Sequence, residues 1–221
     1  MASEPRTTPR IRDGVRAALP LAPGPVLFGL SFGVLAESAG MGAVAAVVMS
    51  GTTFAGSAQF ASASVLETGG SLTAAIVTAL LLNARYIGIS ISVASIFPGG
   101  RVRRLAESQL IVDESWALSG RSGRFEWPIL VGAGSLLYVL WVSSTAVGTL
   151  VGGILDDPNA LGLDAAFAAL FLALARPYLK GRTALTAAAL AALITVALIP
   201  VAPAGVPLVA AAAACLLGLR R

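Results

Sequence analysis

Residues 129–155 read ILVGAGSLLYVLWVSSTAVGTLVGGIL, a stretch without a single charged side chain. It is longer than the roughly 20 residues that an α-helix needs to cross the hydrocarbon core of a bilayer. A second uncharged run, Thr183 to Leu219, shares this property. The whole chain is 57% hydrophobic and 12% charged, which leaves too few polar side chains to cover a water-soluble globule. We therefore expect an integral membrane protein with several transmembrane segments.

Seven apolar segments appear when the uncharged runs are divided at their breaks. They are Leu19 to Ala39, Gly42 to Leu66, Leu72 to Phe97, Pro128 to Gly153, Leu161 to Ala175, Thr183 to Ile199, and Gly205 to Leu219. Helices are expected, because the backbone of a membrane span must satisfy its own polar groups, and the alternating pattern of barrel strands is lacking. The predicted fold class is all-α, a polytopic membrane helical bundle of about six to seven segments. A single transmembrane transporter domain would cover residues 17–221, after a basic tail at residues 1–16.

The basic residues predict the orientation. Fourteen of the fifteen Lys and Arg side chains lie between or outside the apolar segments, in residues 1–16, 101–124, 176–182 and 220–221. Such regions face the cytoplasm. Both termini are therefore predicted to be cytoplasmic, while the connections without Lys or Arg face outward. The Arg-rich and Ala-rich composition and the lack of a convincing cleavage site favour a bacterial cytoplasmic membrane.

The second segment should not be a simple crossing. Three apolar segments separate residues 1–16 from residues 101–124, and three crossings would place these two basic regions on opposite sides. Ser50-Gly51-Thr52-Thr53 and Gly56-Ser57 interrupt the second segment with weak helix formers. We expect this segment to enter and return as two half-helices. Non-helical backbone of this kind is tolerated in a membrane only where it lines a cavity or is buried in protein.

The polar break is also a candidate binding site. Freed N–H groups and hydroxyls between Ser50 and Phe60 could bind a carboxylate, and the start of a half-helix adds a positive dipole end. The alternative is close helix packing through small residues, with the hydroxyls bonded to their own backbone.

Arg85 is the single charged residue within the third segment and the most informative one for function. It lies about twelve residues, or ~18 Å, from either end of that helix, which is too far for its side chain to reach water. A charge in lipid would cost ~2.5–3.5 kcal/mol, so Arg85 should face the protein interior and an anionic partner. That partner is a substrate carboxylate, a carboxylate such as Glu37, or the other half of a permanent structural ion pair. Asn83 can contribute if the helix is irregular there.

The only long polar stretch, residues 98–127, is predicted to be a cytoplasmic amphipathic loop. Val102, Leu105, Val112 and Trp116 form one apolar stripe at helical spacing, which predicts an amphipathic helix on the membrane interface. Asp113-Glu114, within this stretch, is expected to be a solvated pair of charges.

Prolines and glycines shape two of the helices. Pro20, Pro23 and Pro25 should make the first helix irregular near its start. Gly148 and Gly152 form a face of small residues on the fourth segment, for which close packing against another helix is the expected role.

Four motifs together carry a family resemblance. They are the proline-glycine helix Leu19 to Ala36, then Phe54-Ala55-Gly56-Ser57-Ala58-Gln59-Phe60, then Asn83-Ala84-Arg85-Tyr86, and Asp113-Glu114-Ser115. In this order and spacing they resemble the AzlC family, the large subunit of branched-chain amino acid exporters. The likeness extends from about Gly14 to Ala175.

The resemblance implies export of valine, leucine or isoleucine together with a small membrane subunit of the AzlD type. Candidate substrate-binding or translocation residues are Thr52, Thr53, Phe54, Gly56, Ser57, Gln59, Asn83 and Arg85. Candidate coupling or gating residues are Glu37, Asp113, Glu114 and Asp164. The family often has histidine where this chain has Tyr86, and the chain contains no histidine. Any proton coupling must therefore use carboxylates.

Other function classes remain as alternatives. A membrane scaffold or assembly subunit, or a transporter of another small hydrophobic zwitterion, would fit the same pattern. An intramembrane enzyme is disfavoured, because no nucleophile–base pair, metal-ligand set or carboxylate dyad is visible. No phosphate-binding loop for ATP occurs, since the sole lysine, Lys180, follows a leucine. With one cysteine, Cys215, and no histidine, no cofactor or metal is expected.

Overall fold

The computed structural model describes residues 9–67, 69–121, 123–152, 179–202 and 206–211, together with residues 172, 176 and 214. Almost all of the fifth predicted segment, Leu161 to Ala175, and much of the seventh, Gly205 to Leu219, lie outside the described residues. The helices are α1 Ile11–Ala18, α2 Pro23–Ser38, α3 Ala43–Thr53, α4 Gly56–Glu67, α5 Leu72–Asn83, α6 Arg85–Val93, α7 Arg101–Ser108, α8 Asp113–Ser119, α9 Trp127–Val151, α11 Arg182–Leu198 and α12 Val206–Ala211. Strands β1 Gly120–Arg121 and β2 Arg124–Phe125 form one short antiparallel hairpin.

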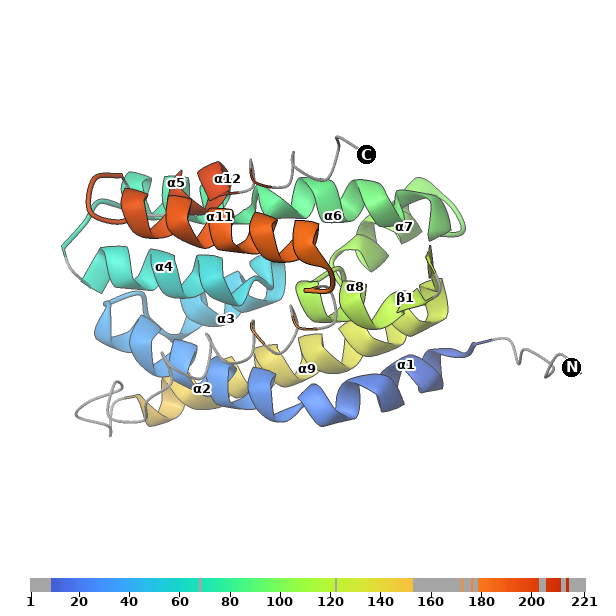
Figure 1. The fold of residues 1–221 in the computed structure, drawn as a ribbon. Helices are drawn as coiled ribbons and strands as arrows, with labels where there is room; N and C mark the ends of the chain where they lie inside the picture. The colour runs from blue at the N-terminus through green and yellow to red at the C-terminus, as the bar shows by residue number, and fades with distance from the viewer. Residues whose placement is uncertain are drawn as a thin grey trace, which may run out of the picture.

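The expectation of a helical bundle is confirmed (Figure 1). Two helical stretches of the described residues are long and apolar enough to cross a membrane, Leu72–Ile96 and Trp127–Val151. A third candidate span is the pair Ile11–Leu21 and Pro23–Ser38, which is bent by 65°. The full number of six to seven segments stays a prediction.

The N-terminal region differs from the predicted polar tail. Helix α1 begins at Ile11, within residues 1–16, and packs along α9. The predicted irregularity of the first helix is confirmed, since a 3-10 turn at Leu19–Leu21 and the bend at Pro23 separate α1 from α2. Proline lacks the N–H that would continue the helical ladder, which explains why the bend lies there.

The predicted break in the second segment is confirmed. Helix α3 ends at Thr53, Phe54 adopts a left-handed conformation with φ 42°, and α4 begins at Gly56. Figure 1 shows α3 and α4 running in opposite directions. The Ser38 hydroxyl at the end of α2 donates to Glu67 Oε1 at the end of α4, at 3.4 Å. The segment therefore enters the bundle and returns to the end from which it started.

Glycine allows α2 and α9 to cross closely, as the face of small residues predicts. A Cβ on Gly33 would lie 2.6 Å from the Thr149 nitrogen, and a Cβ on Gly148 would overlap the Leu30 carbonyl. Phe32 on α2 and Leu137 on α9 are almost fully buried in one core cluster. The closely packed helices α2 and α9 form a wall against which the half-helices α3 and α4 pack.

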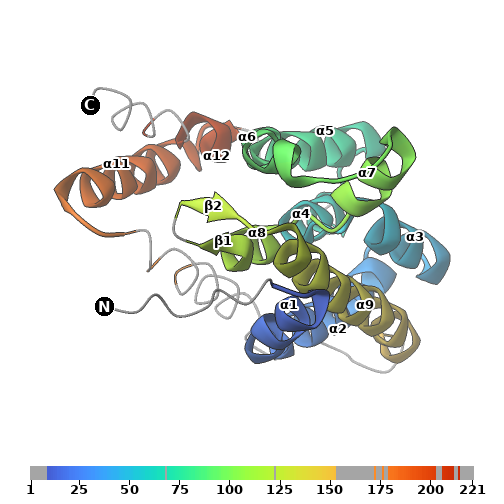
Figure 2. The same cartoon turned by 90° about the vertical axis from the view of Figure 1, so that its right-hand side faces the viewer.

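The expectation that Val102, Leu105, Val112 and Trp116 share one helix is wrong. The polar stretch forms two helices, α7 and α8, separated by residues 109–112. Val102 and Leu105 on α7 are 84% and 75% exposed, whereas Val112 is buried. The stripe is thus divided, because α8 turns inward and packs on α9 and α1. Figure 2, seen from this end of the molecule, shows α8 above α1, with the hairpin beside α8.

Candidate functional site

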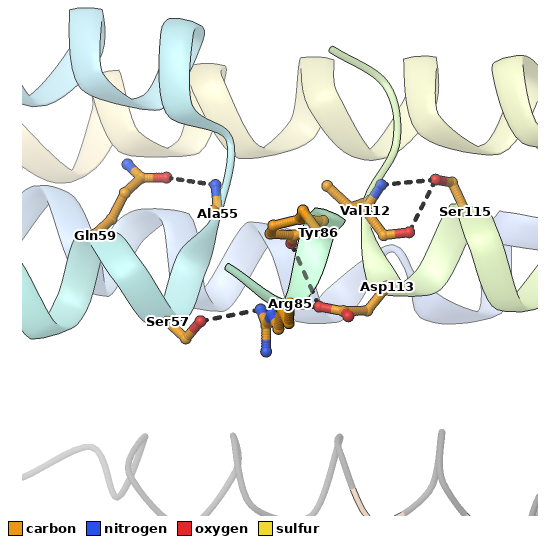
Figure 3. A network of polar contacts seen from close by, with 8 residues as sticks. All are labelled: Ala55, Ser57, Gln59, Arg85, Tyr86, Val112, Asp113 and Ser115. Atoms are coloured by element: carbon orange, nitrogen blue, oxygen red, sulfur yellow. Dashed lines mark hydrogen bonds and ion pairs between the residues drawn. The ribbon is translucent and has the colours of Figure 1, made fainter. Parts of the chain in front are cut away.

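The starts of three helices meet around one cavity. Helix α4 begins at Gly56, α6 at Arg85 and α8 at Asp113, and all three residues line a small cavity of about 50 Å³. The first N–H groups of a helix have no partner within it and carry a partial positive charge. Figure 3 shows the side chains of these first turns pointing toward one another. The cavity has room for a few water molecules.

Arg85 is the centre of the polar contacts. Its Nη2 atom lies 2.9 Å from Asp113 Oδ2 and donates to the Ser57 hydroxyl at 3.0 Å. The Arg85 and Asp113 side chains are only 24% and 23% exposed. The prediction that Arg85 faces the interior and an anionic partner is confirmed. The partner is Asp113 and not Glu37, which lies near the far end of α2, about nine residues beyond the cavity-lining Phe28.

The solvated character expected for Asp113-Glu114 is wrong. Both residues line the cavity, and the Tyr86 hydroxyl donates to Asp113 Oδ2 at 3.4 Å. The pKa of the Glu114 carboxyl is raised to about 7, mainly by burial and also by the negative charge of Asp113, while the hydrogen bond from its own backbone N–H and the charge of Arg85 oppose this rise. The site therefore holds one arginine and two adjacent carboxyl groups that differ in their contacts.

Gln59 stabilises the break between α3 and α4 through three hydrogen bonds. Its Oε1 atom accepts from the Ala55 N–H at 3.2 Å and from the Trp141 indole at 3.1 Å, and its Nε2 donates to Ser50 at 2.8 Å. The Ser50 and Thr145 hydroxyls lie 2.9 Å apart. Gln59 is fully buried and does not line the cavity. It connects α3, α4 and α9, so the geometry gives it a structural role.

Two residues that the sequence motifs did not assign to the site bind the backbone at the break between α3 and α4. Tyr138 on α9 donates to the Gly51 carbonyl at 2.8 Å, and Gln109 donates to the Thr52 carbonyl at 2.9 Å. They satisfy carbonyls that the end of α3 leaves free. The Tyr138 and Phe54 rings meet edge to face, with centroids 5.1 Å apart. In the sequence, only the spacing of Tyr138 and Trp141, which places both on one face of α9, could have indicated that these side chains meet the break.

Apolar residues also line the cavity, and four of them come from α2, the break and α9: Phe28, Phe54, Leu137 and Trp141. All four are buried. They face the charged groups of α6 and α8 across the cavity, so one space presents both a hydrophobic wall and paired charges.

The remaining predicted site residues are divided. Thr52 is exposed and donates to the Val48 carbonyl, and Thr53 does not line the cavity. Asn83 lies at the end of α5, where the helix is irregular at Ala84, and its Oδ1 atom is buried without a hydrogen-bond partner. Asp164 lies outside the described residues.

Fold and site together define a class of protein. It is a helical membrane protein with a charged pocket formed where helices are interrupted, an arrangement that transporters use to hold small charged solutes. The chain matches the family described as AzlC protein over residues 20–155, and it belongs to that family. This is a family of membrane proteins associated with transport and not a family of enzymes.

Individual relatives agree with this assignment. A membrane protein of Archaeoglobus fulgidus is 34% identical over 174 residues, 77% of this chain and 77% of that protein. A membrane protein of Helicobacter pylori is 26% identical over 167 residues, 74% of this chain and 73% of its own. The branched-chain amino acid transport protein AzlC of Bacillus subtilis is 26% identical over 168 residues, 73% of this chain and 65% of that protein. No solved structure matches the chain.

Proposed function

We propose that this chain exports the branched-chain amino acids valine, leucine and isoleucine, together with a small membrane subunit of the AzlD type. The observation that carries the proposal is the cavity in which Arg85 and Asp113 face a wall of buried apolar side chains. The named Bacillus subtilis relative supports the class of substrate. The paired charges fit the two ends of a zwitterion, and the apolar wall fits its hydrocarbon side chain.

The substrate carboxylate would bind Arg85 and the first N–H groups of α4 at Gly56 and Ser57. Carboxylates are stabilised both by guanidinium groups and by helix N-termini. The ammonium group would bind Asp113, with Glu114 beside it. Phe54 and Trp141 would contact the hydrocarbon side chain. Arg85 and Asp113 bind each other at the cavity, so the zwitterion would bind by separating them.

The break at Phe54 supplies the movement that transport requires. The cavity is too small for an amino acid without some widening. A left-handed backbone at a non-glycine residue is strained by about 1 kcal/mol or more and needs its surroundings to hold it. A change of this conformation would move α3 against α4 and alter access to Arg85. Alternating access then follows from motion of the two half-helices against the α2–α9 wall.

We place the chain in a bacterial cytoplasmic membrane with the Arg-rich end of the bundle inside. Helices α1 and α7 and the hairpin carry basic residues and lie at one end of the molecule in Figure 1. The turns after α2 and α4 lie at the other end and contain no Lys or Arg. Residues 17–221 would form one transporter domain. Glu37, near the end of α2 away from Arg85, and Asp164, which lies outside the described residues, stay as gating candidates.

Efflux of preloaded labelled valine, leucine and isoleucine tests the proposal, in cells that express the chain with its small subunit. Arg85→Gln should reduce efflux at least a hundredfold, because the carboxylate loses its charged partner. Arg103→Gln is the matched control, since Arg103 pairs with Glu107 on α7 away from the cavity and should export normally. If wild type exports none of the three amino acids above empty cells, the substrate assignment fails. A scaffold role or another zwitterion then takes its place.

A further inference from the structure

A second hollow lies outside the Arg85 cavity, between the end of α6 and helix α7. It is an open groove of about 370 Å³. Arg101 and Arg104 line it from α7, and Phe97 and Ile111 line it as largely buried apolar residues. The groove shares no lining residue with the Arg85 cavity. Its combination of two arginines and an apolar floor is the feature to be explained.

Within the described part of the chain, no acid pairs with the two groove arginines. Among the ion pairs of the described residues, neither Arg101 nor Arg104 takes part. Glu107, the acid of α7, is committed elsewhere: its Oε1 accepts from Arg103 at 2.7 Å and its Oε2 from the Trp127 indole at 2.8 Å. Arg104 donates to the Ala94 carbonyl at 2.6 Å, which holds its guanidinium at the groove while other N–H groups stay available.

The position of the groove indicates an occupant with an apolar part. Ser90 and Ala94 line the groove from the last turns of the candidate span Leu72–Ile96, so the groove lies beside the end of this span, at the depth of the membrane interface. Ile87 and Ile91 on α6 are 66% and 72% exposed, and Leu105 on the rim is also exposed. A freely soluble anion would use the arginines only and leave this apolar surface unused.

We propose that the groove binds one anionic phospholipid, with the phosphate on Arg101 and Arg104 and an acyl chain along Leu105 and the exposed face of α6. Charge complementarity selects a lipid with net negative charge over a zwitterionic one, since basic side chains at the interface bind anionic headgroups. The bound lipid would fix α7 against the end of α6. This site is independent of the amino acid cavity and of the export proposal.

Native mass spectrometry of the full chain in neutral detergent tests the site, with phosphatidylglycerol and phosphatidylcholine as probes. One phosphatidylglycerol should be retained, and Arg101→Gln/Arg104→Gln should weaken its binding about thirtyfold, as expected for two interfacial basic groups. Arg12→Gln/Arg16→Gln, which removes two exposed arginines from α1, is the matched control and should keep the lipid. Added inorganic phosphate should not displace it.

Three results would overturn the proposal. Equal retention of phosphatidylcholine would remove the role of charge. Displacement by inorganic phosphate would indicate a simple anion site. Loss of the lipid from wild type on addition of the small subunit, with loss of that subunit from the groove variant, would show that a protein and not a lipid covers this face. Circular dichroism of each variant confirms that it is folded.

Discussion

Arg85 and Asp113 lie 28 positions apart in the chain and neutralise each other inside the bundle. Removing one partner leaves the other charge partly buried and unpaired, which is costly, whereas removing both removes the conflict. Arg85→Gln and Asp113→Asn should each destabilise the protein by ~1–3 kcal/mol, and the double variant should recover at least half of the loss. Thermal midpoints in detergent measure this cycle. Additive losses in the double variant would mean that the pair makes no net contribution.

Glu114 predicts a pH dependence of stability. Its pKa is raised to about 7 in the folded protein, so between its ordinary value and 7 the folded state binds a proton that the unfolded state lacks. The free energy of unfolding therefore falls as pH rises through this range. We expect the thermal midpoint to drop by a few degrees between pH 5 and pH 8, and Glu114→Gln to flatten this slope.

The control for Glu114 is another glutamate. Glu67→Gln changes a carboxyl at the end of α4, at the opposite end of the bundle from α8, and should retain the wild-type slope. If both variants retain it, a different group is responsible for the pH dependence.

At the scale of helices, the crossing of α2 and α9 depends on the absence of side chains. Gly148→Ala would force its Cβ against the Leu30 carbonyl, and backbone cannot yield as a flexible side chain can. We expect a loss of ~1–3 kcal/mol from the forced separation of the helices, seen as a lower thermal midpoint and reduced abundance in the membrane. Gly88→Ala is the matched control, because nothing lies within 4 Å of its Cβ position on α6, and helix propensity should make it neutral or stabilising by about 0.5–1 kcal/mol.

Local composition was sufficient to predict some elements and not others. The break at Phe54 follows from weak helix formers near Gly51 and Gly56, and the bend at Pro23 follows from the missing N–H. The identity of the Arg85 partner did not follow, because Asp113 reaches it only when α8 folds back onto α9. The apolar stripe of residues 102–116 predicted one helix wrongly, because its helical spacing continues across residues 109–112, where the chain is not helical.

For the molecule as a whole, the two turns after α2 and α4 give the decisive test of topology. If α3 and α4 enter and return, residues 38 and 71 face the same side of the membrane, and the basic end with α7 faces the other. Ser38→Cys and Ser71→Cys, each in a Cys215→Ser background with no other thiol, should react with a membrane-impermeant maleimide in intact cells. Ser108→Cys on α7, which is equally exposed, should react only after permeabilisation. A simple crossing would instead label positions 38 and 71 from opposite sides, and it would also separate the Ser38 hydroxyl from Glu67, which the structure joins at 3.4 Å.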